Sequence, residues 1–592
     1  MSETVSTNFE DSRRLTGPNL FFGSCGAALE AFPSESGDGQ ALERWAHHVQ
    51  GMRQCLGWRE GHVVARVHAS GASLAMAAAE DQLFTATEVN EWAWLRALEE
   101  TSGSVLGRFS APGHPAVWDE ASAAATLRAM AAAEARPELM ALLREADLRN
   151  LPALLDEATL SLGAGSGHIA WPMDALSSVD AIPWSQLHCV PVVLVTGSNG
   201  KTTSVRLLAA MAAAHGWTPG HTCTDGIYVA GQLVEAGDYS GPGGARSVLR
   251  DARVEAAILE TARGGILRRG LSVRRADVAL VTNVSPDHFG EYGIHTIEEL
   301  ADTKLVVARA VAPFGLLVLN ADDDGLAARA PTLSCPIGWF SQDDDHPHLR
   351  NHRATGGATC GVRGGRLRLS WKGGDHDLGE VASMPLSSSG RAAYNISNLA
   401  GAALAAAGLG IAPATIASVL ATFGASRKDN PGRMEIWRFG GITVFMDYAH
   451  NPEGLEGLLN VASLARGPGR LGLLLGQAGN RDDGAIRGLA AMAARFEPDL
   501  LVLKDLDGFM RGREPGEVPS ILRKELEARG MAADRLRVVL PEEEAVLALL
   551  GWARGGDVLV LPVHGTKARD AVGAKLDRLE TGGWIVGDPI PG

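Results

Sequence analysis

The residues best placed to do chemistry lie in one short stretch, VVLVTGSNGKTTS at positions 192–204. Four apolar residues run into a turn with Gly197 and Gly200, and an alanine-rich apolar run follows. This pattern predicts a strand, a tight turn and the start of a helix. Backbone N–H groups in such a turn bind phosphate, and the helix dipole strengthens the attraction. Lys201 then reaches the β- and γ-phosphates, and the Thr202 hydroxyl ligates Mg²⁺. We therefore predict that the chain binds a nucleoside triphosphate.

The spacing of this turn differs from the common phosphate-loop pattern G-x-x-x-x-G-K-[ST], because position 195 is valine. The alternative is a glycine-rich turn with an incidental lysine. The apolar strand directly before the turn favours a phosphate loop. We expect the turn residues to contact the nucleotide together: Gly197, Ser198, Asn199, Gly200, Lys201, Thr202 and Thr203.

Further polar residues follow other predicted strands of the same region. Glu260 ends the apolar run 256–260, and Asn283 and His288 lie at and after the run 278–284. Ligands of an open parallel sheet bind beyond the carboxyl ends of its strands. We therefore expect Asn283 to contact the nucleotide, Glu260 to bind Mg²⁺ near the phosphates and His288 to be a second metal ligand. Lys304 lies on a predicted helix with an apolar face, where it either extends to solvent or has a special role.

The elements that must position these residues alternate between strand and helix from about residue 186, which predicts an α/β protein with parallel sheets. We predict an α+β domain at 1–185, a central ATP-binding domain at 186–430 and a doubly wound, Rossmann-like domain at 431–592. In the first domain we expect a strand at 62–68 and helices at 123–134 and 137–146. For the third domain we expect strands at 442–446, 471–475, 500–503, 536–540 and 558–561. Two successive α/β units predict an active site in the cleft between them.

A polar, glycine-rich stretch at 341–357 interrupts the alternation and contains several aspartates and histidines. Nothing around these side chains would fix metal-ligand geometry. We interpret the stretch as a solvated loop, followed by a strand at 366–371.

Composition excludes several classes of function. The net charge of −15 argues against nucleic acid and anionic membrane as partners, because both require basic surface. The six cysteines include no C-x-x-C pair, which argues against a zinc site or a disulfide framework. The sequence shows no apolar run long enough for a membrane span and no signal-peptide pattern. We expect a cytoplasmic enzyme that forms a homo-oligomer.

Seven motifs in order resemble the Mur ligase family, and most closely the Mur-ligase-like half of the cyanophycin synthetases. They are TGSNGKTTS, LETARGGILRRGL, TNVSPDHFGEYGIHTIEELADTK, NAD at 320–322, YNISNLAGA at 394–402, NPGRMEI at 430–436 and DYAHNPEGL at 447–455. RRLTGPNLF at 13–21 also resembles the opening of the N-terminal domain of cyanophycin synthetases. Those enzymes carry an ATP-grasp domain between the two parts, and this sequence leaves no space for one.

The resemblance implies ATP and Mg²⁺ as cofactors. Lys201 and Thr202 would hold the phosphates and a first Mg²⁺, while Glu260 and His288 would bind a second. Lys304 matches a lysine that Mur ligases often carbamylate, and as a carbamate it would help to hold that metal. Asn395 and Asn398 match an asparagine pair near the adenine. Arg433 and Asp447 match nucleotide-contacting residues of the C-terminal domain, and His450 and Asn451 would lie beside the acceptor.

Charged residues at predicted strand ends of the third domain are candidates for substrate binding. Arg481, Arg511 and Arg513 could grip carboxylates, since a guanidinium binds them in a bidentate manner. The acidic residues nearby could equally bind a basic side chain: Asp482, Asp505, Asp507 and Glu517. His564 ends the last predicted strand, where it either lines the site or has its hydrogen bonds satisfied locally.

The resemblance implies an ATP-dependent carboxylate–amine ligase that works through an acyl phosphate and joins an amino acid to an acidic peptide or cyanophycin-like acceptor. A separate ATP-grasp enzyme would supply a polymer backbone. The alternatives are a plain ATPase or phosphotransferase, and a non-catalytic ATP-binding subunit; the intact set of predicted site residues argues against both. The first domain either binds the acidic acceptor, with Arg13 and Arg14 as candidates, or has a structural or oligomerisation role.

Overall fold

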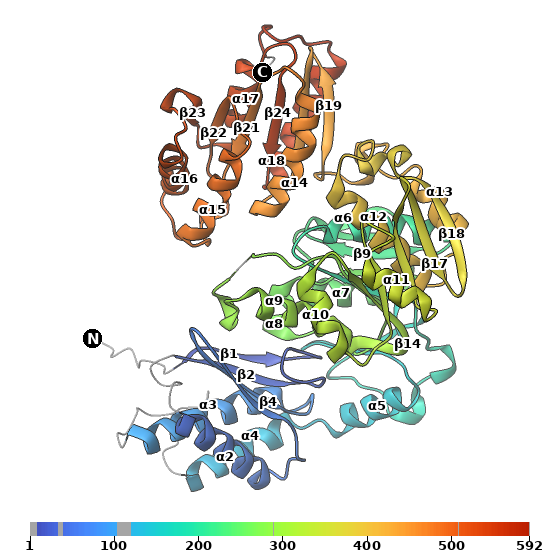
Figure 1. Ribbon diagram of the computed structural model, residues 1–592. Coiled ribbons are helices and arrows are strands. Elements are labelled where there is room, and N and C mark those ends of the chain that lie inside the picture. Colours follow the sequence, from blue (N-terminus) through green and yellow to red (C-terminus); the bar gives the residue numbers. More distant parts are fainter. Residues whose placement is uncertain (1–8, 33–38, 103–119, 288, 507, 591–592) are drawn as a thin grey trace. The chain divides into compact units, whose positions relative to one another are not determined.

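The computed structural model describes residues 9–32, 39–102, 120–287, 289–506 and 508–590 (Figure 1). The chain forms two compact units. The first comprises residues up to 340 with 351–359 and 401–412, and the second comprises 341–350, 360–400 and the residues from 413 onward.

The first unit begins with a four-stranded antiparallel sheet, which we call the small sheet, in the order β1-β2-β4-β3. Helices α2 and α3 cover one of its faces, and α4 packs against both helices (Figure 1). The strands and helices are β1 (Phe9–Leu15), β2 (Gly26–Ala31), β3 (Val63–His68), β4 (Gly71–Ala77), α2 (Gly39–Cys55), α3 (Leu83–Ser102) and α4 (Glu120–Glu134). Trp45 and Trp94 are fully buried in the core beneath the sheet. The predicted strand at 62–68 and helix at 123–134 are confirmed.

A short segment links the small sheet to the centre of this unit. Helix α5 (Pro137–Leu148), predicted from the sequence, precedes an antiparallel sheet of β5 (Ala153–Leu155), β6 (Thr159–Leu162) and β7 (Ile169–Pro172). Leucines from the helix and the sheet form a small core of their own.

The central sheet of the first unit has the strand order β11-β10-β9-β12-β8-β13-β14-β15. Its strands are β8 (Val192–Thr196), β9 (Pro219–Cys223), β10 (Gly226–Val229), β11 (Gln232–Ala236), β12 (Ala256–Glu260), β13 (Ala276–Val281), β14 (Val311–Asn320) and β15 (Ile337–Phe340). Strand β8 pairs in parallel with β12 on one side and β13 on the other. The carboxyl ends of these three strands therefore meet at one edge of the sheet. The helices are α6 (Lys201–His215), α7 (Pro242–Leu249), α8 (Arg263–Arg269), α9 (Ile297–Lys304) and α10 (Asp324–Arg329).

The segment that follows differs in part from the prediction. The polar stretch predicted as a loop contains helix α11 (Pro347–Ala354), in which Leu349 is the buried residue. The helix is held by this leucine and by the His352 ring, whose Nε2 lies 2.9 Å from the Ile337 carbonyl, and neither tertiary contact can be read from the local polar pattern. Strand β17 (Arg366–Trp371) confirms the predicted strand and pairs with β18 (Gly374–Glu380), next to β16 (Thr359–Arg363). Helices α12 (Ala393–Gly408) and α13 (Pro413–Leu420) follow.

The second unit ends in a six-stranded sheet with the order β19-β20-β24-β21-β22-β23, parallel except for β19. Its strands are β19 (Glu435–Phe439), β20 (Ile442–Asp447), β21 (Leu471–Leu475), β22 (Leu500–Leu503), β23 (Leu536–Val538) and β24 (Val558–Pro562). Its helices are α14 (Pro452–Arg466), α15 (Asp483–Ala494), α16 (Glu517–Ala528), α17 (Glu542–Trp552) and α18 (Thr566–Thr581). The predicted fold class, an α/β protein with an N-terminal α+β part and two further α/β sheets, is confirmed.

None of the helices in the described ranges is both long enough and apolar enough to cross a membrane.

Candidate active site

The predicted phosphate loop lies where the central strand β8 ends and α6 begins. Gly197 has φ +146°, and a Cβ there would lie 1.8 Å from the Thr282 hydroxyl, so only glycine fits. Gly200 has φ +84° and is the N-cap of α6. The Lys201 ammonium donates to the carbonyls of Gly197 and Ser198 at 3.0 and 3.1 Å. The amine therefore lies over the loop, as the binding of a terminal phosphate requires.

Residues after β13 hold this loop in place. The side chain of Asn283 accepts a hydrogen bond from the Asn199 amide at 2.9 Å and donates to the Asn199 carbonyl at 3.2 Å. The Ser198 amide donates to the Asn283 carbonyl at 2.9 Å, and the Ser198 hydroxyl donates to the Ser285 carbonyl at 3.0 Å. Asn283, predicted as a nucleotide contact, thus fixes the shape of the loop through the loop's own backbone.

Glu260 lies beside the first turn of α6. The Thr202 hydroxyl donates to the Glu260 carboxylate at 2.8 Å, and the Thr224 hydroxyl lies 3.2 Å from that of Thr202. Glu260 is 1% exposed, and its amide donates to the Thr222 hydroxyl. Mg²⁺ prefers oxygen ligands of this kind. The hydroxyl and carboxylate oxygens therefore fit a Mg²⁺ ion next to a bound phosphate.

Lys304 is the last residue of α9 and is buried, with 3% of its surface exposed. Burial lowers the pKa of its amine to about 7, the charge on Lys201 lowers it further, and the Asp287 carboxylate opposes the shift. Helix α9 starts with a capping box in which Thr296 and Glu299 exchange hydrogen bonds. The structure thus brings Lys304 into the electrostatic reach of the phosphate loop.

His288 lies outside the described residues, as does Asp507. Within the parts of the chain that the structure describes, no three His, Cys, Asp or Glu side chains gather in a way that could hold a metal ion. A metal at the phosphate loop would therefore draw on Thr202, Glu260 and the phosphates themselves, and the roles of His288 and Lys304 as ligands stay predictions.

The predicted nucleotide contacts of the second unit cluster around the end of β20. The Met434 amide donates to the Asp447 carboxylate at 2.6 Å, and the Tyr394 hydroxyl donates to the Met434 sulfur. Burial raises the pKa of Asp447, and the guanidinium of Arg433 opposes the shift. Arg433 lies 4.3 Å from the centre of the Tyr448 ring. The cluster pairs an aromatic face with charged groups.

Asn395 and Asn398 lie one turn apart on α12, and both are buried. The side-chain NH₂ of Asn398 donates to the side-chain oxygen of Asn395 at 3.2 Å, and the side-chain NH₂ of Asn395 donates to the Leu386 backbone carbonyl at 3.0 Å. Asn451 is the N-cap of α14, where its side chain accepts from the Gly454 amide at 2.8 Å. His450 precedes that cap, and Gln477 donates to its carbonyl at 2.9 Å.

The three candidate substrate arginines have different surroundings. Arg513 donates to the carbonyls of Gly479 and Arg481 at 2.9 Å and forms ion pairs with Asp483 and Glu517. Its guanidinium therefore joins the loop between β21 and α15 to the residues that precede α16. Arg481 is 9% exposed. Arg511 is exposed, has a left-handed backbone at φ +45° and lies 5.8 Å from the Phe509 ring centre.

His564 belongs to a buried ionic network that the sequence did not reveal. Lys504 and Glu542 form an ion pair with at most 1% of either side chain exposed, and the Lys504 ammonium lies 3.4 Å from His564 Nδ1. His564 Nε2 lies 3.0 Å from the Ala449 carbonyl, so we assign the ring proton to Nε2. Burial and the Lys504 charge lower the pKa of His564 to about 4. These contacts are those of a locally satisfied strand-end histidine.

Replacing Lys504 with alanine is expected to destabilise the second unit by about 3–5 kcal/mol, because Glu542 would keep a buried charge without its cation. Urea unfolding at pH 7 measures the change. Lys524→Ala on the exposed side of α16 is the matched control. The double variant Lys504→Met with Glu542→Leu should recover most of the loss, since neither charge then remains buried. Equal stability of Lys504→Ala and the wild type would refute this prediction.

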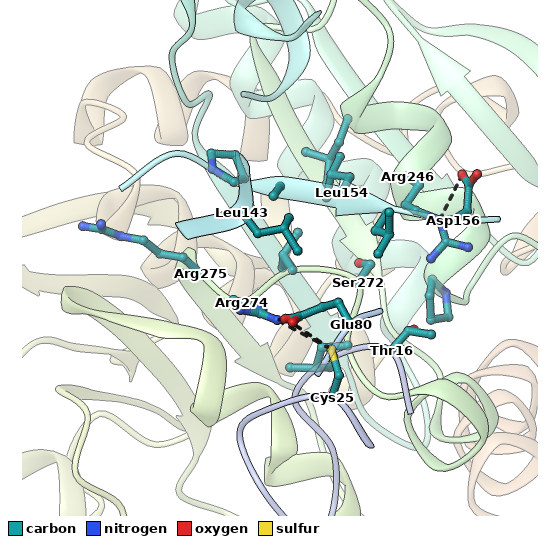
Figure 2. A pocket seen from close by; sticks show the side chains of 18 of the residues that line it. Thr16, Cys25, Glu80, Leu143, Leu154, Asp156, Arg246, Ser272, Arg274 and Arg275 are labelled. Carbon is teal, nitrogen blue, oxygen red and sulfur yellow. Dashed lines mark hydrogen bonds and ion pairs between the residues drawn. The ribbon is translucent and has the colours of Figure 1, made fainter. Parts of the chain in front are cut away.

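A cavity of about 1280 Å³ in the first unit lies at a different place from the phosphate loop (Figure 2). The first residues of β8, β13 and β14 help to line it, at the edge of the central sheet opposite the loop. Figure 2 shows Arg274 turned toward Glu80 and Cys25, and Arg246 toward Asp156. The lining of this cavity thus contains ion pairs between guanidinium and carboxylate groups.

Comparison with known proteins identifies two domains of this chain. The Mur ligase middle domain matches residues 195–406, and the Mur ligase glutamate ligase domain matches residues 432–562. The chain is 37% identical over 387 residues to the cyanophycin synthetase of Trichormus variabilis, covering 65% of this chain and 42% of that protein. It is 28% identical over 397 residues to the UDP-N-acetylmuramoyl-L-alanyl-D-glutamate–2,6-diaminopimelate ligase of Chlorobaculum tepidum, covering 63% and 71%.

Among solved structures, E. coli FolC in complex with DHPP and ADP aligns with 66% of this chain and 89% of its own length, with 19% identity and a TM-score of 0.47. The chain spans less than half the length of the cyanophycin synthetases that it matches. Its phosphate loop, Glu260 and Lys304 all lie in the range matched by the middle domain. Residues 195–406 and 432–562 thus belong to the Mur ligase family, as its middle domain and its C-terminal domain.

Proposed function

We propose that the chain is an ATP-dependent ligase that forms an amide between an acceptor carboxylate and an amino acid. The observation that carries the proposal is the combination, in one unit, of a phosphate loop whose Thr202 contacts Glu260 and a buried lysine, Lys304, within electrostatic reach of Lys201. A plain ATPase needs the phosphate loop with Thr202 and Glu260 but not the buried lysine. The names of the relatives that the chain resembles, a cyanophycin synthetase and a diaminopimelate ligase, support this proposal.

The proposed reaction has two steps. The acceptor carboxylate attacks the γ-phosphorus of ATP, the bond to the β-phosphate oxygen breaks, and ADP leaves. The amino group of the incoming amino acid then attacks the carbonyl carbon of the acyl phosphate, loses a proton and displaces inorganic phosphate. Lys201 neutralises the charge on the transferring phosphoryl group, which is the main task in phosphoryl transfer. Bound Mg²⁺ would supply further charge neutralisation, with Thr202 and Glu260 as its ligands.

Lys304 is proposed to act as a carbamate. A neutral amine attacks CO₂ and releases a proton, which leaves an anion where the lysine cation stood. Its pKa of about 7 leaves about half of the amine neutral at pH 7. Without burial, almost all of the amine would be protonated and unreactive. The carbamate would then add an oxygen ligand for a second metal, together with His288.

We further propose ATP as the nucleotide, with Asn395, Asn398, Arg433 and Asp447 as contacts from the second unit. The proposal keeps the division into domains at 1–185, 186–430 and 431–592. The acceptor is an acidic peptide or polymer, and a separate ATP-grasp enzyme supplies the backbone if the acceptor is a polymer. The similarity to cyanophycin synthetases supports this acceptor class.

The test is an acceptor scan. The protein is incubated with ATP, Mg²⁺ and an aspartate-rich peptide, each of the twenty amino acids is added in turn, and the peptide mass and ADP are measured. We expect one amino acid to add the mass of one residue to the peptide, with one ADP formed per amide. ADP formation that is independent of both substrates would favour a plain ATPase. Nucleotide binding without ADP formation under any pairing would favour a non-catalytic subunit.

A further inference from the structure

The small sheet contacts two segments that lead to the candidate active site. One is the stretch between Asp287 and α9, which we call the 289–296 loop, and the other is helix α8, which follows Glu260 (Figure 1). Neither family domain extends over the small sheet, whose strands lie between residues 9 and 77. The two matched family domains therefore do not explain what the small sheet does.

Arg66 of β3 makes the main contact with the 289–296 loop. Its guanidinium donates to the carbonyls of Tyr292 and Gly293 at 2.8 and 3.1 Å and to the Glu299 carboxylate at 3.2 Å. Glu299 also belongs to the capping box of α9 and accepts from the amides of His295 and Thr296. A single guanidinium thus joins the small sheet, the loop and the first turn of the helix that ends in Lys304.

Arg13 makes the corresponding contact with α8. Its Nε donates to the Leu267 carbonyl at 3.0 Å, and its guanidinium lies 4.6 Å from the centre of the Tyr292 ring. The Glu30 carboxylate accepts from the same guanidinium at 2.6 Å, so the charge stays paired although Arg13 is 6% exposed. The chain after β1 continues this contact, because the Thr16 amide donates to the Arg269 carbonyl at 2.8 Å. RRLTGPN at 13–19 therefore lies along α8.

The backbone of the 289–296 loop depends on these contacts. Tyr292 has φ +54°, an unfavourable left-handed conformation for a residue other than glycine. Gly293 also has positive φ, and a Cβ there would lie 2.3 Å from the His68 ring. Ser70 bridges His68 and His295 at 3.1 and 2.7 Å. A strained loop that touches the sheet so closely persists only while the sheet holds it.

We propose that the small sheet is a positioning domain for the active site, in which Arg66 and Arg13 hold the 289–296 loop and α8 so that Lys304 and Glu260 stay next to the phosphate loop. This inference rests on the proposed ligase function. Arg66 does not contact the phosphate loop and is a positioning residue. Displacing a reacting group by about 1 Å lowers turnover on the order of a hundredfold, so small movements of α9 matter.

The first experiment compares Arg66→Ala with Arg96→Ala in the full-length protein. Arg96 belongs to the same part of the chain, has a similar exposed fraction (28% against 22%) and pairs with Glu99 and Glu100 of its own helix. Amide hydrogen exchange is followed in peptides covering 289–304 and in α6. For Arg66→Ala we expect exchange about tenfold faster in 289–304 and unchanged in α6. Turnover should fall about tenfold to a hundredfold with KM for ATP unchanged, whereas Arg96→Ala should match the wild type.

A second pair of variants approaches the contact from the loop. Gly293→Ala forces a methyl group into the His68 ring at a backbone φ of +66°, whereas Gly290→Ala carries at least as much backbone strain at φ +96° but meets no atom within 4 Å. We expect the losses seen for Arg66→Ala in Gly293→Ala, and much smaller ones in Gly290→Ala. This pair keeps the test valid if Arg66→Ala fails to fold.

The outcomes separate the two proposals. A wild type that forms no ADP with any acceptor contradicts the ligase function, and with it the catalytic purpose of the contact. An active wild type whose Arg66→Ala and Gly293→Ala variants keep their turnover contradicts the positioning role alone. Loss of turnover through a higher KM for ATP, with slow exchange in 289–304, also contradicts it, because the contact would then act on nucleotide binding.

Discussion

Lys201→Ala is expected to lower ADP formation by about three orders of magnitude or more. The Lys201 ammonium donates to the carbonyls of Gly197 and Ser198, in a loop whose shape depends on two glycines with positive φ. Removing one preorganised charge from a phosphoryl-transfer site costs about 10³-fold or more in rate. The loss arises in the transition state, where negative charge spreads over the transferring group.

The measurement is coupled detection of ADP under the conditions that give wild-type turnover, with thermal unfolding of the variant recorded alongside. Lys201 is only half-buried, so the variant should unfold at nearly the wild-type temperature. Lys524→Ala, which removes an exposed lysine from α16, is the control for a change in net charge. Wild-type activity in Lys201→Ala would contradict the assignment of the phosphate loop, whatever the acceptor.

The sequence predicted those parts of the fold in which local pattern and tertiary role agree. A buried parallel strand must be a continuous apolar run, and β21, β22 and β24 are such runs, as are the first four residues of β8 and the last four of β13. Strands β2 and β4 of the small sheet, GAALEA and GASLAMA, are also fully buried, but they consist mostly of small residues with no strand preference. Their burial under α3 decides their conformation, and sequence pattern alone does not show it.

The residues of the candidate site also divide into those that have a local sequence signal and those that do not. Gly197, Gly200, Lys201, Thr202 and Glu260 could be predicted because the loop and the strand ends are local features. Lys504 and Glu542 were missed because they pair across 38 positions, and each by itself is an ordinary charged residue. The contact of Arg66 with the 289–296 loop joins positions 226 apart and has no local signal at all. Lys504 does carry one local signal, because it follows strand β22 immediately and so lies at a strand end.

Lys304→Met is expected to have two opposite effects, a gain in stability and a loss of turnover of about a thousandfold, because methionine cannot form the carbamate proposed to help hold a second metal. The amine is buried, and its pKa falls from an ordinary 10.5 to about 7 in the folded protein. The unfolded chain therefore binds more protons than the folded one between pH 7 and pH 10.5, and stability rises with pH across this window. At pH 7 and below, burying the amine costs about 5 kcal/mol, which a methionine of similar size avoids.

The stability measurement uses urea unfolding in CO₂-depleted buffer at pH 7.0 and pH 9.5. We expect Lys304→Met to be more stable than the wild type at pH 7.0 and the difference to shrink at pH 9.5, because the wild type gains stability as the pH rises. Lys524→Ala, whose amine is exposed, should show no such change with pH. An unaltered or lower stability of Lys304→Met at pH 7.0 would show that the amine is well solvated or paired in the folded protein.

The activity measurement separates a carbamate from a simple buried cation. Since only the neutral amine reacts with CO₂, its reactive fraction should fall about tenfold between pH 8 and pH 6 when the pKa is about 7. Wild-type turnover should therefore decrease when CO₂ is removed, recover when bicarbonate is added, and need more bicarbonate at pH 6 than at pH 8. If Lys304→Met gained stability and also kept its turnover, Lys304 would act neither as a carbamate nor as a cation that the reaction needs. Natural proteins retain a destabilising buried charge where function requires it. Loss of turnover together with a gain in stability is therefore the result expected if Lys304 takes part in the reaction.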